Sequence, residues 1–172
     1  MDTKKLTVGK NPPEEVNVFI EIPKGSSVKY ELDKETGIIF VDRFFYTAMF
    51  LPANYGFIPE SFGEDGDPLD ALVLSSESVA PGVVIPSKVI GLLEMEDEAG
   101  IDTKIIAVPT EKIDPLFGSY SDVSQVPLAF KNKIKHFFEN YKTLEPGKWV
   151  KVKEWRGKKE ALEAVKKAIK NK

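Results

Sequence analysis

Hydrophobic and polar residues alternate over much of the first two thirds of the chain, which is typical of β-strands. Residues 28–32 alternate strictly, so Lys29 and Glu31 should share one face of a strand. Further strands are expected over residues 16–22, 38–41, 71–74, 88–95 and 103–108. A turn at Thr36 and Gly37 and a polar loop at residues 96–102 predict two hairpins in this region.

A helical period replaces the alternation in the last third of the chain. One apolar stripe consists of Leu128, Ile134, Phe137, Phe138 and Tyr141. Ser124 is the expected N-cap of this helix, Pro127 fits its first turn, and residues 145–147 should end it. A second amphipathic helix from about Lys159 carries Leu162, Val165 and Ile169 on one side. Short strands followed by helices predict a mainly β fold with α-helices, either a small barrel or a sandwich, with the helices packed outside.

The length and composition narrow the possible functions. The 172 residues predict a single domain over residues 1–172. The net charge of −3 makes nucleic acid and anionic membranes poor partners, and no segment approaches the ~20 apolar residues of a membrane span. The N-terminus lacks the apolar core of a secretory signal, so a cytoplasmic protein is expected. The chain has no cysteine, which excludes thiolate chemistry, and it has one histidine, which excludes sites with several imidazoles.

The segment at residues 64–70 carries the first candidate chemistry. Asp65, Asp67 and Asp70 lie within six residues, separated by Gly66 and Pro68. Carboxylates this close repel one another unless a cation lies between them, and Mg²⁺ prefers such oxygen ligands. A solvated acidic turn is the alternative. A calcium loop of the EF-hand type is excluded, because its sixth and twelfth positions require Gly and Glu where this chain has aspartate and serine.

A second acidic segment spans residues 96–102. If it forms a hairpin loop, Asp97 and Asp102 stand at its two ends and lie close in space, with Lys104 on the same strand face as Asp102. A polar surface hairpin is the alternative. Two acidic turns, each beside a strand end, favour a shared metal site.

Several isolated residues are each compatible with more than one role. Lys29, Arg43 and Lys104 are each compatible with a solvated surface charge, and Lys142 suits the C-terminal end of a helix dipole. Tyr55, in a loop beside a glycine, fits either the core or a site. We interpret His136 as a surface or subunit-contact residue.

The chain resembles the family I soluble inorganic pyrophosphatases. The resemblance rests on DGDPLDA and, in order along the chain, on EIPKG, VKYELDK, VDRFFYTAMF, PANYGFIPESFGEDGDPLDALVL, DEAGIDTKIIAVP and HFFENYKTLEPGKWVKV. It extends from about Gly9 to the last helix, and the compact size is similar to the prokaryotic branch. One departure is Leu51, where many members carry Tyr, so a hydroxyl on the phosphate side is missing here.

This resemblance implies a five-stranded OB-like barrel flanked by two main helices. It implies Mg²⁺-dependent hydrolysis of inorganic diphosphate to two orthophosphates by direct attack of a metal-activated water, in a cytoplasmic homohexamer, with Mn²⁺ or Zn²⁺ as substitute ions. By the family motifs, Asp65, Asp70 and Asp102 would bind the activating metal pair, Asp97 further Mg²⁺, and Asp67 would be the general base. Phosphate contacts would come from Lys29, Arg43, Lys104, Tyr141 and Lys142, with Tyr55 nearby and Glu21 and Glu31 acting through water.

Two other classes of protein are alternatives to a pyrophosphatase. An OB-like barrel often binds single-stranded nucleic acid through separated stacking aromatics. Phe44, Phe45, Tyr46 and Phe50 are too dense for such a platform, and the acidic charge balance also opposes it. A Ca²⁺-stabilised structural protein is the other alternative, and the failed EF-hand match counts against it.

Overall fold

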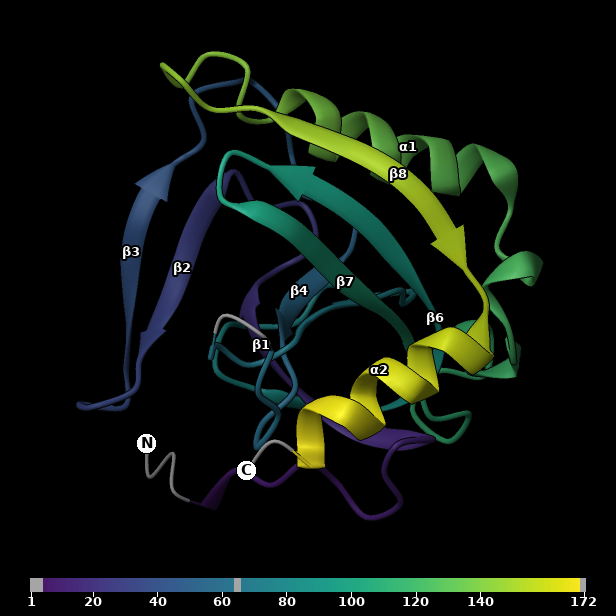
Figure 1. The fold of residues 1–172 in the computed structure, drawn as a ribbon. Helices are drawn as coiled ribbons and strands as arrows, with labels where there is room; N and C mark the ends of the chain where they lie inside the picture. Colours follow the sequence, from purple (N-terminus) through teal and green to yellow (C-terminus); the bar gives the residue numbers. More distant parts are fainter. Residues whose placement is uncertain (1–4, 64–65, 171–172) are drawn as a thin grey trace.

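Five strands close into a barrel (Figure 1). The computed structural model describes residues 5–63 and 66–170. In ring order the strands are β1 (Glu15–Ile22), β4 (Asn54–Phe57), β5 (Asp70–Val73), β7 (Gly100–Pro109) and β6 (Val84–Asp97). The ring closes because β1 pairs with both β4 and β6. All neighbours are antiparallel except β5 and β7, which are parallel. The predicted five-stranded OB-like barrel is therefore confirmed.

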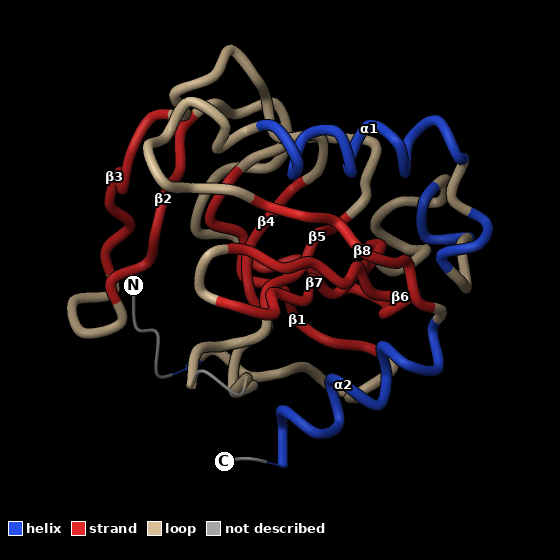
Figure 2. The backbone as a smooth tube through the Cα atoms, turned by 45° about the horizontal axis from the view of Figure 1, so that its top comes forward, coloured by secondary structure: helices blue, strands red, loops and turns tan. Residues whose placement is uncertain are grey.

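Strand β5 is buried on both of its faces. Its apolar run does not alternate, because Leu72 packs into one core cluster while Ala71 and Val73 pack into another. Helix α1 (Leu128–Asn140) contributes to the first cluster and α2 (Lys158–Lys170) to the second. The two helices lie on opposite sides of the strands (Figure 2).

The first predicted hairpin stands apart from the barrel. Strands β2 (Val28–Asp33) and β3 (Ile38–Phe44) form their own two-stranded sheet at the left of Figure 1. The second hairpin is tighter than expected. Strand β6 runs to Asp97 and β7 begins at Gly100, so Asp97 and Asp102 lie within paired strands rather than in a loop.

Strands β4 and β8 were not predicted. Tyr55, which was expected in a loop, lies in β4. Strand β8 (Val150–Arg156) extends the sheet along β6. The register of this pair shifts between Leu93 and Met95, which puts an extra residue into β8 and interrupts its two-residue period.

The helical region differs from the prediction in four details. Ser124 lies in the short 3₁₀ helix η3 (Val123–Gln125), which Asp122 caps, and Pro127 takes the N-cap position of α1. Another 3₁₀ helix, η2, spans Phe117–Ser119. Leu128 is 69% exposed and lies outside the buried stripe, and α1 ends at Asn140, before residues 145–147.

None of the helices in the described ranges has the length and apolar character needed to cross a bilayer.

Asp114 joins two of the loops that frame the barrel. Its buried carboxylate accepts hydrogen bonds from the backbone and hydroxyl of Ser76, at 2.7 and 3.1 Å, and from the N–H groups of Leu116 and Phe117. Burial alone would raise the pKa of Asp114, but these donors hold it below the ordinary value. The carboxylate therefore stabilises the fold above pH 3.8, and this contribution is lost as the pH falls through the lower pKa of the folded state.

Replacing Asp114 with Asn should lower the free energy of unfolding at neutral pH by about 1–3 kcal/mol, because the amide turns an N–H group toward donors. Urea unfolding at neutral pH and again below pH 3.8 measures this difference, which should shrink in acid. The exposed neighbour Glu111, changed to Gln, is the control. Equal stability of Asp114→Asn and the parent at neutral pH would contradict the prediction.

Candidate active site

The parallel pairing of β5 and β7 brings the two acidic segments together. Ala71 pairs with Ile105, which places Asp70 beside Lys104. The Lys104 Nζ lies 2.5 Å from Asp70 Oδ2 and 2.6 Å from Asp102 Oδ1. Asp102 and Lys104 share a strand face, as predicted. Oxygens from two distant stretches of sequence therefore converge on one point.

Lys104 is the buried centre of this cluster. Its side chain is only 6% exposed. Burial alone would lower the pKa of Lys104, but the carboxylates of Asp70 and Asp102 contribute to raising it well above the ordinary value, so the ammonium stays charged. Lys104 also donates a hydrogen bond to the Tyr55 hydroxyl at 3.2 Å. Burial raises the pKa of Tyr55, which keeps that phenol neutral.

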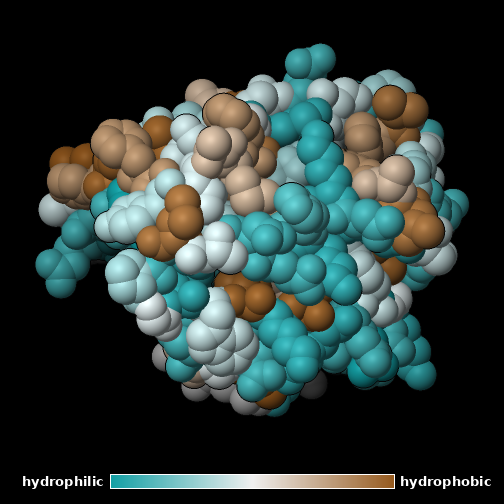
Figure 3. Space-filling model, turned by 90° about the horizontal axis from the view of Figure 1, so that it is seen from above, coloured by the Kyte–Doolittle hydropathy of each residue, from teal (hydrophilic) through white to brown (hydrophobic). Residues whose placement is uncertain are grey.

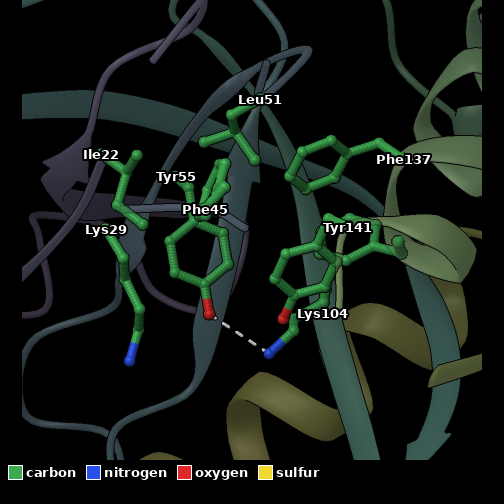
Figure 4. Close-up of a pocket in the computed structure, with 9 residues that line it drawn as sticks. Ile22, Lys29, Phe45, Leu51, Tyr55, Lys104, Phe137 and Tyr141 are labelled. Atoms are coloured by element: carbon green, nitrogen blue, oxygen red, sulfur yellow. Dashed lines mark hydrogen bonds between the residues drawn. The ribbon is translucent and has the colours of Figure 1, made fainter. Parts of the chain in front are cut away.

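A small cavity of about 50 Å³ lies next to this cluster. The polar ends of Lys29, Tyr55, Lys104 and Tyr141 point in the same direction, away from its apolar wall (Figure 4). That wall consists of Ile22, Phe45, Leu51, Phe137 and Phe138. Leu51 is buried in it and supplies no hydroxyl. The arrangement gives a polar, partly cationic edge on a rigid apolar support.

A larger cavity of about 650 Å³ lies on the acidic side of Lys104. Asp67, Asp70 and Asp102 all line it. Asp67 is the most exposed of them, at 73%, and its Oδ1 lies 2.8 Å from Lys34 Nζ in the β2–β3 turn. Asp65, the fourth predicted acid of this group, lies outside the described residues.

The carboxylate oxygens of Asp70 and Asp102 suit a hard divalent cation, because they already converge on a single positive charge. Within residues 5–63 and 66–170, no three acidic or histidine side chains form a ready-made metal-binding group. Lys104 provides the positive charge between the two carboxylates in this structure.

Lys142 and Asp97 form a separate ion pair at 3.0 Å, at the junction of α1 and the β6–β7 hairpin. Asp97 pairs with Gly100 and Asp102 with Met95, so the two aspartates are diagonal neighbours on one face of the hairpin. The carboxylate of Asp97 is directed to Lys142. Burial raises the pKa of Tyr141 despite the nearby cations of Lys142 and Lys104.

The supporting acids differ from one another. Glu21 is half-buried and accepts the Leu32 N–H at 2.8 Å. Burial raises the pKa of Glu21 to about 7, and the charges of Asp70 and Glu31 act in the same direction. Glu31 itself is 62% exposed and lies 3.5 Å from Lys29. His136 is exposed on α1, as expected for a surface residue.

Two further acids contact Lys29 or Arg43 without a role predicted from the sequence. Asp42 bonds Lys29 and Arg43, and Glu145 bonds Arg43. The only sequence signal was that Asp42 precedes Arg43. The contacts of Asp42 depend on an irregularity in the strand pairing, and the contact of Glu145 joins residues 102 positions apart. Neither kind of contact leaves a pattern in the sequence.

Comparisons with known proteins give a consistent result. The family model described as inorganic pyrophosphatase matches residues 18–172. An inorganic pyrophosphatase of Aquifex pyrophilus is 60% identical over 99% of this chain and 97% of its own, and one from Saccharolobus solfataricus is 57% identical over 98% of each. The crystal structure of inorganic pyrophosphatase from Thermus thermophilus has a TM-score of 0.95 at 49% identity, covering 99% of this chain and 98% of its own.

Proposed function

The chain belongs to the inorganic pyrophosphatase family of enzymes, and we propose that it hydrolyses inorganic diphosphate to two orthophosphates at the cluster around Lys104. One observation supports this assignment of the site above all. Two acidic segments meet at a buried ammonium, beside a cavity whose polar edge carries two lysines and two tyrosine hydroxyls. The acidic side suits cations and the basic side suits phosphate oxygens.

The family is metal-dependent, and the carboxylates here fit that requirement. Asp70 and Asp102, with Asp65, would hold the activating ions, and Asp97 would hold further ones. Mg²⁺ is the proposed ion, with Mn²⁺ or Zn²⁺ as substitutes. When bound, such ions lower the pKa of water and neutralise phosphate charge.

The protein side chains then have separate tasks. Lys29, Lys104 and Lys142 act as point charges on the phosphate oxygens, and Arg43 offers a planar fork. The hydroxyls of Tyr55 and Tyr141 add neutral donors, while Glu21 and Glu31 act through water. In the reaction a water oxygen bonds to one phosphorus, the bridging P–O bond breaks, and Asp67 accepts the proton of the water. The transfer is direct, without a phosphorylated protein intermediate.

We extend the proposal to the assembly. The 172 residues act as one domain, in a cytoplasmic homohexamer that binds neither nucleic acid nor membranes. Exposed apolar side chains on β3 and the loop after it support a subunit contact. These residues are Ile38, Phe40, Val41, Phe44, Tyr46 and Phe50. Seen from above, hydrophobic side chains gather toward the left edge, on the side of the β2–β3 hairpin (Figure 3).

The function is tested by measuring phosphate release from diphosphate, with Mg²⁺ and with a chelator, and with ATP as the control substrate. Release should require Mg²⁺ and should be at least about a hundredfold faster with diphosphate than with ATP. Equal rates on both substrates, or no release in the presence of Mg²⁺, would show that the proposed function is wrong.

A further inference from the structure

Asp42 is the extra residue of a β-bulge in the β2–β3 hairpin. Lys29 pairs with Arg43, whereas Tyr30 pairs with Val41, so Asp42 has no residue opposite it. A bulge changes the direction of the side chains at that point. Asp42 and Arg43 are consecutive, and consecutive strand residues normally face opposite sides. Here the Asp42 carboxylate reaches the same side as Arg43 and Lys29.

One oxygen of Asp42 contacts both cations. Its Oδ2 lies 3.0 Å from Lys29 Nζ and 2.6 Å from Arg43 Nη1. Burial alone would raise the pKa of Asp42, but the hydrogen bond and charge of Lys29, together with Arg43, lower it. Lys29 and Arg43 are opposite one another across the two strands, where like charges repel. Asp42 supplies the negative charge between them.

Glu145 holds Arg43 from another part of the fold. It lies in the turn after α1, and its Oε1 is 3.3 Å from Arg43 Nε. The Glu145 side chain is only 10% exposed, so the pair is shielded from solvent better than an ordinary surface pair. The same turn begins with Tyr141 and Lys142. The contact therefore fixes the hairpin relative to the segment that carries two other predicted phosphate ligands.

We propose that Asp42 and Glu145 are positioning residues that hold Lys29 and Arg43 in the orientation that binds diphosphate. The two carboxylates engage the guanidinium at Nη1 and Nε, which fixes the plane of its fork. Each carboxylate contacts a predicted phosphate ligand, so each acts through a cation. This inference rests on the proposed function, because it takes Lys29 and Arg43 as ligands of diphosphate.

The test compares Asp42→Asn and Glu145→Gln with the parent enzyme. Each should raise the KM for diphosphate about 3- to 30-fold and change kcat by less than about threefold, because a lost orientation weakens substrate binding. Asp42→Glu restores a carboxylate and should recover part of the KM. Glu35→Gln removes a charge from the exposed turn of the same hairpin and should leave both constants unchanged.

A double-mutant cycle separates this inference from the proposed function. If Glu145 acts through Arg43, Glu145→Gln should change KM by less than about twofold in an Arg43→Lys enzyme that already has a raised KM. Additive effects would overturn the role of Glu145. An unchanged KM in both Asp42→Asn and Glu145→Gln, with a lower kcat and melting temperature, would show a merely structural role. An unchanged KM in Arg43→Lys would instead overturn the assignment of Arg43 to the substrate, and this inference with it.

Discussion

Replacing Asp67 with Asn is expected to lower kcat about 10²- to 10⁴-fold at saturating diphosphate and Mg²⁺. An amide has nearly the size of a carboxylate but does not accept a proton from water. The Asp67 side chain is 73% exposed, so its stability cost should be small. Steady-state kinetics and thermal unfolding of the same preparations measure the two quantities.

The ion pair of Asp67 with Lys34 offers a different explanation of such a loss, and a control excludes it. Lys34→Gln removes the partner at 2.8 Å and leaves the carboxylate in place. If Asp67 is the base, Lys34→Gln should keep kcat within about threefold of the parent, because exposed pairs contribute little. A similar fall in both variants would show that the contact matters rather than proton transfer. A nearly normal rate in Asp67→Asn would remove the general-base role.

The parts of the fold that sequence predicts are those determined by local pattern. Strict alternation located β2, and the apolar run at residues 71–74 located β5, whose one-residue offset reflects only where pairing begins. The acidic cluster needed one more step, since Asp70 and Asp102 meet only because β5 and β7 are parallel neighbours. Two acidic turns beside strand ends favoured a shared site, but spacing alone does not contain the parallel pairing that brings them into contact.

The remaining features depend on irregularities and on distant partners. Strand β8 was missed because an extra residue interrupts its period. Asp42 gains its role from a bulge, and Glu145 from a turn that follows a helix ending five residues earlier. Ser124 resembles an N-cap locally, yet Asp122 caps the preceding 3₁₀ turn instead. The contacts of Asp42 and Glu145 are tertiary and leave no local signal, whereas Asp122 displaces Ser124 as a cap through a local capping box with Gln125.

The position of Lys104 connects the two halves of the site. It lines the small cavity with Lys29 and Tyr141, and it also bonds two carboxylates that line the larger one. One ammonium therefore lines the proposed phosphate side while balancing the acidic side. Without divalent ions, Lys104 is the cation in direct contact with both Asp70 and Asp102 among the residues that the structure describes.

Replacing Lys104 with Met is therefore expected to have two effects of different origin. The free energy of unfolding of the metal-free protein should fall by about 2–4 kcal/mol. This is less than the largest losses seen when a fully buried ion pair is broken, because the carboxylates of Asp70 and Asp102 are 32% and 29% exposed. The value of kcat/KM should fall about 10²- to 10³-fold, because a charge on the phosphate side is lost. Unfolding in a chelator and in Mg²⁺, together with steady-state kinetics, measures both effects.

The two effects respond differently to Mg²⁺, which makes the prediction specific. Ions bound by Asp70 and Asp102 replace the missing positive charge, so Mg²⁺ should raise the melting temperature of Lys104→Met more than that of the parent. Activity should stay low, because the ions do not replace the ammonium on the phosphate side. Lys153→Met removes the exposed partner of Glu96 at 2.7 Å and should change neither quantity. If Lys104→Met is as stable as the parent in chelator, or if Mg²⁺ leaves the stability gap unchanged, Lys104 does not balance a metal-binding pair of carboxylates.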